Sequence, residues 1–319
     1  MRGRAVHLML AAMLLCAASH AQALVPYTGT TVTVASSTDG APQDIPATLL
    51  KPEGAGPFPA IVIMHDCSGL GARSSGAPGR WGQLLAGAGY VVIIPDSFAP
   101  RGFPTGVCTV AASGPALRAT LPAARVRDAY AALAFLRKLD YVARDRVGVM
   151  GGSHGGSTTL AVMADEADAR GPGAEGAYMG FAAGIALYPG CGAAYGAWNV
   201  TRQRGFTGPV TGFVGTYKPV APLLILIGEK DDWTPAAHCE ELTLRAQAAG
   251  YPVSIKVYPG ALHSFDSANP PRYLDERRNA NKPDGHGATT GGDPAAWADA
   301  IKQVNGFFAR YLGGGPPKD

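Results

Sequence analysis

The sequence has few charged residues, no long apolar run beyond its start, and none of the common metal-binding motifs. Only 16% of its 319 residues are charged and the formal net charge is +3, so the chain lacks the basic surface that nucleic-acid binding requires. After the first 23 residues, no apolar run reaches the roughly 20 residues of a membrane-spanning helix. Neither CxxC nor HExxH occurs. We therefore expect no nucleic-acid partner, no membrane span in the mature chain and no bound metal.

The N-terminal segment, residues 1–23, has the organisation of a secretory signal peptide. Two arginines lie within the first four residues, residues 5–18 are largely apolar, and residues 21–23 form a small-x-small cleavage pattern. The alternative, an N-terminal membrane anchor, would need a longer apolar run. We expect cleavage after Ala23 and a secreted or periplasmic mature protein, residues 24–319. The sequence does not indicate the oligomeric state.

Apolar runs typical of strands alternate with helical patterns along the mature chain, and 47% of all residues are hydrophobic. This alternation predicts one α/β domain with a mostly parallel sheet and helices on both faces. The eight predicted strands cover residues 31–34, 46–50, 60–64, 90–95, 146–150, 182–188, 223–227 and 252–258. The stretches 191–221 and 266–292 are rich in Gly, Pro and polar residues without clear periodicity, so they are predicted to be loop insertions at one rim of the sheet.

A candidate nucleophile follows the strand predicted at 146–150. Gly151-Gly152-Ser153-His154-Gly155 fits the pattern G-x-S-x-G, and the small residues after Ser153 are compatible with the start of a helix. A strand, a tight turn and a helix form the nucleophile elbow that exposes a serine hydroxyl above a sheet. The flanking glycines are expected because side chains at 151 and 155 would collide with neighbouring backbone.

The predicted base and acid also follow strands. Of the mature histidines, only His263 comes in the loop directly after the last strand, where its imidazole can reach back to the serine. Asp231 and Asp232 follow the strand at 223–227; the spacing to Pro235 favours Asp231 as the group that orients the imidazole, with Asp232 as the alternative. The order Ser153, Asp231, His263 is that of α/β-hydrolases.

Two backbone N–H groups are expected to stabilise an oxyanion. One is that of His154, directly after the serine, and the other that of Cys67, in the loop after the third strand. Cys67 itself is a poor candidate nucleophile because no base is evident beside it. The helix at 235–249 is predicted to begin with Thr234 as its N-cap.

Four cysteines remain after removal of the leader, and an oxidising compartment favours two disulfides with three possible pairings. The order of the predicted strands favours Cys67–Cys108 and Cys191–Cys239. The first bridge would tether the loop that carries Cys67. The second would hold the loop that carries Asp231 and Asp232, called the acid loop below. Four buried free thiols are the alternative.

These segments together resemble the dienelactone hydrolase family of α/β-hydrolases, and most closely its exported bacterial members. The resemblance spans residues 45–313 and depends on the segments 60–70, 96–102, 149–156, 227–235 and 258–265. It implies hydrolysis of small-molecule lactones or esters through an acyl-enzyme, without a cofactor. The enzymes that named the family use a cysteine where Ser153 stands. They also bind the substrate carboxylate with arginines; Arg101 is one candidate for such an arginine here, and a structural role is the alternative.

The function predicted from the sequence is therefore that of a secreted serine hydrolase that cleaves carboxylic esters or lactones. A peptidase or an acyltransferase on the same scaffold is a second possibility, because both use the same three side chains. A non-catalytic binding member of the fold is a third.

Overall fold

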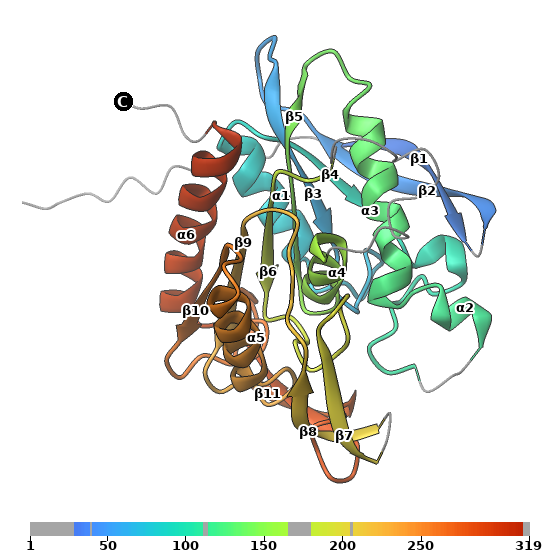
Figure 1. Ribbon diagram of the computed structural model, residues 1–319. Coiled ribbons are helices and arrows are strands. Elements are labelled where there is room, and N and C mark those ends of the chain that lie inside the picture. Colours follow the sequence, from blue (N-terminus) through green and yellow to red (C-terminus); the bar gives the residue numbers. More distant parts are fainter. Residues whose placement is uncertain (1–28, 39, 111–113, 165–179, 205–206, 315–319) are drawn as a thin grey trace, which may run out of the picture.

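An eight-stranded sheet forms the centre of the computed structural model (Figure 1), which describes residues 29–38, 40–110, 114–164, 180–204 and 207–314. The predicted signal peptide lies outside these residues. The strand order in the sheet is β1-β2-β4-β3-β5-β6-β9-β10. The first two strands pair antiparallel with each other, and β2 pairs antiparallel with β4; all the other neighbours are parallel. This is the α/β-hydrolase fold that the sequence predicts.

All eight predicted strands belong to this sheet. Their observed bounds are β1 (Thr30–Thr38), β2 (Ala41–Leu50), β3 (Phe58–Met64), β4 (Val91–Pro95), β5 (Val142–Gly152), β6 (Ala183–Leu187), β9 (Leu223–Gly228) and β10 (Val253–Tyr258). The runs in β3, β4, β6 and β9 are almost entirely buried, because a parallel strand covered on both faces has no polar side to show to solvent.

Helices cover both faces of the sheet. On one face α1 (Ala77–Gly87) and α6 (Pro294–Leu312) meet through Trp81 and Trp297, whose rings lie 4.6 Å apart. On the other, α3 (Pro122–Leu136) packs on α4 (His154–Met163), with α5 (Ala236–Ala248) against β9 and β10. The short α2 (Pro115–Arg118) and a 3₁₀ turn at Ala99–Arg101 precede α3. In these described ranges, no helix combines the length and apolarity needed to span a membrane.

The two segments predicted to be loop insertions each contain a two-stranded hairpin, so that prediction is wrong in its detail. The first hairpin consists of β7 (Asn199–Arg204) and β8 (Thr207–Val214), and the second of β11 (Arg272–Arg278) and β12 (His286–Thr290). The side chains of β11 are mostly exposed, so no apolar alternation marks it as a strand. Both hairpins lie near the carboxyl ends of the parallel strands (Figure 1).

Candidate active site

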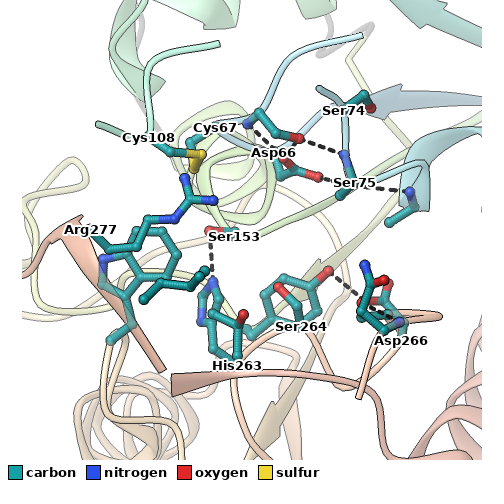
Figure 2. A pocket seen from close by; sticks show the side chains of 18 of the residues that line it. Asp66, Cys67, Ser74, Ser75, Cys108, Ser153, His263, Ser264, Asp266 and Arg277 are labelled. Atoms are coloured by element: carbon teal, nitrogen blue, oxygen red, sulfur yellow. Dashed lines mark hydrogen bonds between the residues drawn. A yellow bond between two sulfur atoms is a disulfide. The ribbon is translucent and has the colours of Figure 1, made fainter. Parts of the chain in front are cut away.

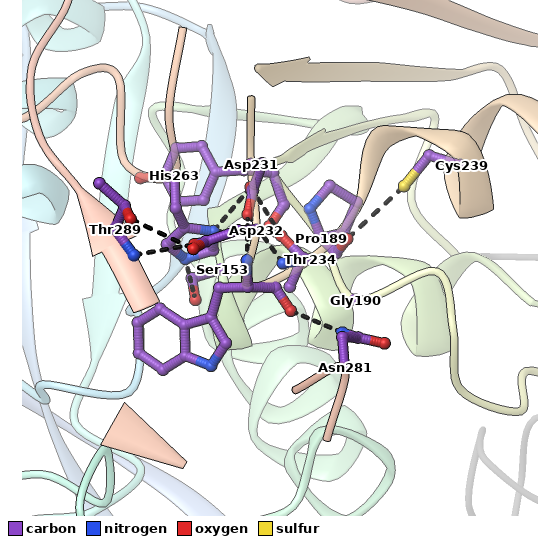
Figure 3. Close-up of polar contacts among 12 residues, drawn as sticks. Ser153, Pro189, Gly190, Asp231, Asp232, Thr234, Cys239, His263, Asn281 and Thr289 are labelled. Carbon is purple, nitrogen blue, oxygen red and sulfur yellow. Dashed lines mark hydrogen bonds and ion pairs between the residues drawn. The ribbon is translucent and has the colours of Figure 1, made fainter. Parts of the chain in front are cut away.

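Ser153, His263 and Asp231 form an unbroken chain of hydrogen bonds at the carboxyl ends of three parallel strands (Figure 3). The Ser153 Oγ lies 2.9 Å from Nε2 of His263, and Nδ1 of His263 lies 2.7 Å from Oδ2 of Asp231. The carboxylate can only accept, so Nδ1 is the protonated nitrogen and Nε2 accepts the serine proton. The side chains of His263 and Asp231 are 1% and 0% exposed. The hydrogen bonds thus run in the direction that a general base at His263 requires, from the serine hydroxyl to Nε2 and from Nδ1 to the carboxylate.

The turn around Ser153 has the strain that the sequence predicts. Ser153 has a φ of 53°, unusual for a residue other than glycine, and its N–H donates to the Leu187 carbonyl at 2.9 Å. A Cβ at Gly155 would lie 1.9 Å from the Met64 carbonyl oxygen, and one at Gly151 would lie 2.5 Å from it. Only glycine at both positions allows the elbow to approach β3 so closely.

Asp231 is held by the backbone of its own loop. Its Oδ1 accepts from the N–H groups of Trp233 and Thr234, at 3.0 and 2.7 Å. The Thr234 hydroxyl lies 2.8 Å from Oδ2 and 3.1 Å from Nδ1 of His263. Both oxygens of the Asp231 carboxylate therefore accept hydrogen bonds from its own loop, which hold the side chain in place.

Thr234 is a site residue whose role the sequence analysis missed. It was predicted as the N-cap of α5, but that helix begins at Ala236, its N-cap residue is Pro235, and no side chain caps it. The prediction was wrong because the Thr234 hydroxyl contacts the Asp231 carboxylate and the imidazole instead. Its proximity to the aspartate in sequence was the available signal.

Asp232, the alternative acid, points away from the imidazole. Its carboxylate accepts from the N–H of Thr289 at 2.8 Å (Figure 3). It also pairs with Nζ of Lys282 at 3.0 Å. The geometry therefore favours Asp231 as the partner of His263.

Tyr188 and Asp266 lie beside His263 and were not predicted as site residues. The Tyr188 ring packs edge-on against the imidazole, with 4.8 Å between ring centroids, and its hydroxyl donates to Asp266 at 2.8 Å. The second oxygen of Asp266 accepts from Nε1 of Trp81, also at 2.8 Å. Burial raises the pKa of Asp266, and burial followed by the charge of Asp266 raises the pKa of Tyr188. Asp266 therefore holds the Tyr188 ring in place, and that ring packs against the imidazole of His263.

The two backbone N–H groups predicted for the oxyanion lie on different elements. His154 is the first residue of α4, and Cys67 lines the same pocket as Ser153. The imidazole of His154 lies 2.8 Å from Nη1 of the fully buried Arg125. Burial and the nearby Arg125 charge lower the pKa of His154 well below its ordinary value, so the neutral ring accepts this bond through Nδ1.

Both predicted disulfides are present, joining Cys67 to Cys108 and Cys191 to Cys239. The first lines the pocket above Ser153 (Figure 2), and the Cys67 carbonyl also accepts from the N–H of Val107 at 2.7 Å. A thiolate at Cys67 is therefore absent, which agrees with serine as the nucleophile. The second disulfide lies away from the pocket and joins the loop after β6 to α5.

The pocket over Ser153 has a volume of about 130 Å³ and a charged lining. It contains two carboxylates, Asp66 and Asp266, and the four arginines Arg73, Arg80, Arg272 and Arg277. Asp66 accepts from the Ser68 and Ser75 hydroxyls. Arg277 points between the disulfide and Ser153 (Figure 2); its Nε has no hydrogen-bond partner among the described residues but lies 3.8 Å from Oε1 of Glu276. Both pocket carboxylates thus accept hydrogen bonds, while the Arg277 guanidinium lies beside the nucleophile.

The family model of the dienelactone hydrolase family matches residues 45–312. The chain belongs to this family. As a member, the protein is a hydrolase that acts on ester bonds.

One protein is similar to this dienelactone hydrolase family member in sequence, and two solved proteins are similar to it in fold. A protein of Methylorubrum extorquens assigned as a carboxymethylenebutenolidase is 27% identical over 233 residues, which cover 73% of this chain and 72% of the relative. A solved protein of Klebsiella pneumoniae assigned as a dienelactone hydrolase has a TM-score of 0.58 and 18% identity, covering 89% of this chain and all of the other. Thermogutta terrifontis esterase 2, solved as the form phosphorylated by paraoxon, has a TM-score of 0.58 and 16% identity, with 93% and 98% covered.

Arg101, the arginine considered for substrate binding, does not line the pocket of this family member. Its guanidinium pairs with Asp128 at 2.8 Å, and both side chains are at most 2% exposed. It also donates to the carbonyl of Ser97 at 2.6 Å. Arg101 therefore has a structural role, joining the segment after β4 to α3. Among the described residues, no group of three or more His, Cys, Asp or Glu side chains is arranged to hold a metal ion.

Proposed function

We propose that this protein is an exported serine hydrolase that cleaves small carboxylic esters or lactones through an acyl-enzyme on Ser153. The observation that supports this most is the hydrogen-bonded sequence from Ser153 through His263 to Asp231, at 2.9 and 2.7 Å. It opens onto a pocket large enough only for a small substrate.

The proposed reaction has two halves. The Ser153 hydroxyl attacks the ester carbonyl while Nε2 of His263 takes its proton, and Asp231 stabilises the imidazolium that forms. The N–H groups of Cys67 and His154 stabilise the negative oxygen of the tetrahedral intermediate. His263 then protonates the leaving alcohol, and a water molecule, deprotonated by the same imidazole, releases the acid and restores the serine.

Export is part of the proposal and is supported by two features. Disulfides persist in oxidising compartments, and the structure has two that do not involve a redox motif. The first 23 residues have the organisation of a signal peptide.

The pocket favours substrates with a negative charge on the acyl portion. Four arginines line it, and the two aspartates there already accept hydrogen bonds from Ser68, Ser75, Trp81 and Tyr188. The Arg277 side chain is 20% exposed and stands over the Trp233 ring at 5.7 Å. Its only ion pair among the described residues is a long one, 3.8 Å from Nε to Oε1 of the largely exposed Glu276, so the guanidinium is suited to bind a substrate carboxylate. The name of the Methylorubrum relative denotes a lactone bearing a carboxymethylene group, which agrees with such a substrate.

Replacing the nucleophile tests the proposal. We expect Ser153→Ala to lower kcat toward p-nitrophenyl butyrate by about 10⁴-fold or more, since the remaining groups alone give little turnover. Its circular dichroism spectrum and melting temperature should stay close to those of the wild type. Equal turnover by the variant would overturn the proposal. Product analysis with added amines and alcohols distinguishes hydrolysis from acyl transfer, and a peptide panel distinguishes it from proteolysis; inertness of the wild type toward all of these would indicate a binding protein.

A further inference from the structure

The β11–β12 hairpin forms one wall of the pocket over Ser153. It provides Arg272, Leu274 and Arg277 from β11 and Thr290 from β12. Thr290 also forms a bridge to His263, and the N–H of Gly291 donates to the His263 carbonyl at 3.0 Å. The hairpin is thus next to the base as well as to the substrate pocket.

The hairpin's own strand pairing does not fix Arg277. Regular pairing links Leu274 with Ala288 and then resumes only at Arg278 with His286. Three residues on β11 therefore face a single residue on β12, and Arg277 lies within this bulge. A bulged residue leaves the ladder and takes a direction set by its other contacts.

The Arg277 guanidinium stands over the Trp233 ring of the acid loop at 5.7 Å, and its Nε lies 3.8 Å from Oε1 of Glu276. The hairpin that carries Arg277 is itself attached to the acid loop. The Asp232 carboxylate accepts from the N–H of Thr289 at 2.8 Å and from its hydroxyl at 3.1 Å, and it pairs with Lys282 at 3.0 Å. The Trp233 indole donates to the Arg278 carbonyl at 2.8 Å. Two asparagine side chains of the turn donate to the carbonyls of residues 232 and 233, each at 2.9 Å: Asn279 and Asn281.

We infer that Asp232 is a positioning residue for substrate selection: it holds the β11–β12 hairpin so that Arg277 faces the anionic acyl group of a substrate bound at Ser153. The inference rests on the proposed function. Asp231 and Asp232 are adjacent but divide two tasks, since Asp231 contacts the imidazole and Asp232 contacts β12 (Figure 3). Loss of the Asp232 carboxylate leaves both backbone donors of Asp231 in place, so the chemical step should be spared.

The test compares two esters that differ only in charge. In p-nitrophenyl butyrate the acyl chain ends in a methyl group, and in mono-p-nitrophenyl succinate it ends in a carboxylate. We expect Asp232→Ala to raise KM for the succinate ester about 10-fold, the effect of losing one charge-assisted contact, with kcat within about twofold. KM for the butyrate ester should stay unchanged. Thr289→Val, which removes only one hydroxyl, should produce a smaller change in the same direction.

A double-mutant cycle and a matched control complete the design. Because Asp232 acts through Arg277, adding Asp232→Ala to Arg277→Met should lower the succinate preference no further than Arg277→Met alone. Asp299→Asn is the control, because Asp299 also makes a half-exposed pair, with Lys256, but lies on α6 away from the pocket. It should leave both KM values unchanged.

Several results would overturn the inference. These are an equal rise of KM for both esters in Asp232→Ala, a loss of kcat comparable to that of an Asp231 variant, or fully additive effects in the cycle. A wild type that hydrolyses both esters without preference would also overturn it while leaving the ester hydrolase intact. If the wild type hydrolyses neither ester, the proposed function fails. The inference is then judged by calorimetry, which measures the binding of monomethyl succinate to Ser153→Ala. Adding Asp232→Ala should weaken this binding about 10-fold. Unchanged binding would contradict the inference.

Discussion

The two walls of the pocket are built differently. The wall with Ser153, Asp231 and His263 consists of short loops directly after buried parallel strands, and the Asp231 and His263 side chains are at most 1% exposed. The other wall, the β11–β12 hairpin, is attached to the acid loop by polar contacts, and the Asp232–Lys282 pair between the two is 27% and 34% exposed. The core thus fixes the proposed triad, while a hairpin attached by polar contacts presents the side chains proposed to contact the rest of the substrate. Substitutions in the first wall should affect kcat, and those in the second should affect KM.

Substitution of Asp231 should have the largest effect and tests this difference between the walls most severely. We expect Asp231→Asn to lower kcat by about 10³–10⁴-fold, because an amide in place of the carboxylate neither holds the correct tautomer nor stabilises the imidazolium. KM should change little, in contrast to Asp232→Ala. Steady-state kinetics of both variants with mono-p-nitrophenyl succinate, the charged ester, give the answer. A mild kcat effect at Asp231 and a severe one at Asp232 would reverse the assignment of the two aspartates.

The two disulfides give a second contrast, because only one lines the pocket. Each closes a loop of 41 or 48 residues, so removing either should lower the free energy of unfolding by about 4 kcal/mol in the chain-entropy model. Cys67→Ser/Cys108→Ser should in addition lower kcat at least about 10-fold, since the Cys67 N–H loses its tether. In Cys191→Ser/Cys239→Ser, kcat should equal that of the wild type at any temperature below the melting temperature of the variant. Chemical denaturation and kinetics on both variants measure this; equal kcat in the two would remove the link between the first disulfide and the oxyanion.

The smallest expected effect concerns His154, behind the elbow. Its pKa is lowered by burial and by the Arg125 charge, so the unfolded chain binds the extra proton and the folded chain does not. The stability from the neutral ring is present above the ordinary pKa of 6.5 and is lost as the pH falls below it. His154→Gln keeps an acceptor for Arg125 but cannot titrate. Between pH 7 and pH 5 we therefore expect the variant to lose less unfolding free energy than the wild type.

The exposed His286 supplies the control for this pH measurement. His286→Gln makes the same substitution away from the elbow and is measured over the same pH range. If His154→Gln and His286→Gln both match the wild type, His154 has no depressed pKa and the neutral ring assigned to it is wrong.

The parts of the molecule that could be predicted from the sequence share one physical cause. Buried parallel strands require continuous apolar runs, so β3, β5 and β9 are visible in the sequence, and the loops after them locate Cys67, Ser153 and Asp231. The glycines at 151 and 155 add a steric requirement that only the elbow explains.

The parts that could not be predicted depend on contacts between distant polar residues. β11 has mostly exposed side chains and a bulge, so its sequence gives no alternation, and Arg277 becomes a pocket residue only because the acid loop holds the hairpin. Thr234 is a good N-cap by residue type, yet its hydroxyl is used by Asp231. Tyr188 is predicted only as the end of a strand, and nothing in the sequence links it to Asp266, 78 residues later.

The most direct test of the central claim is the site of covalent reaction with an organophosphorus reagent such as paraoxon, followed by peptide mass mapping. The proposed triad predicts one adduct per chain, on Ser153, with loss of esterase activity in proportion to labelling. It also predicts a labelling rate lowered about 10³-fold or more in His263→Ala, since the serine then has no base. An adduct on any other residue, or full labelling of Ser153 with esterase activity retained, would contradict the account.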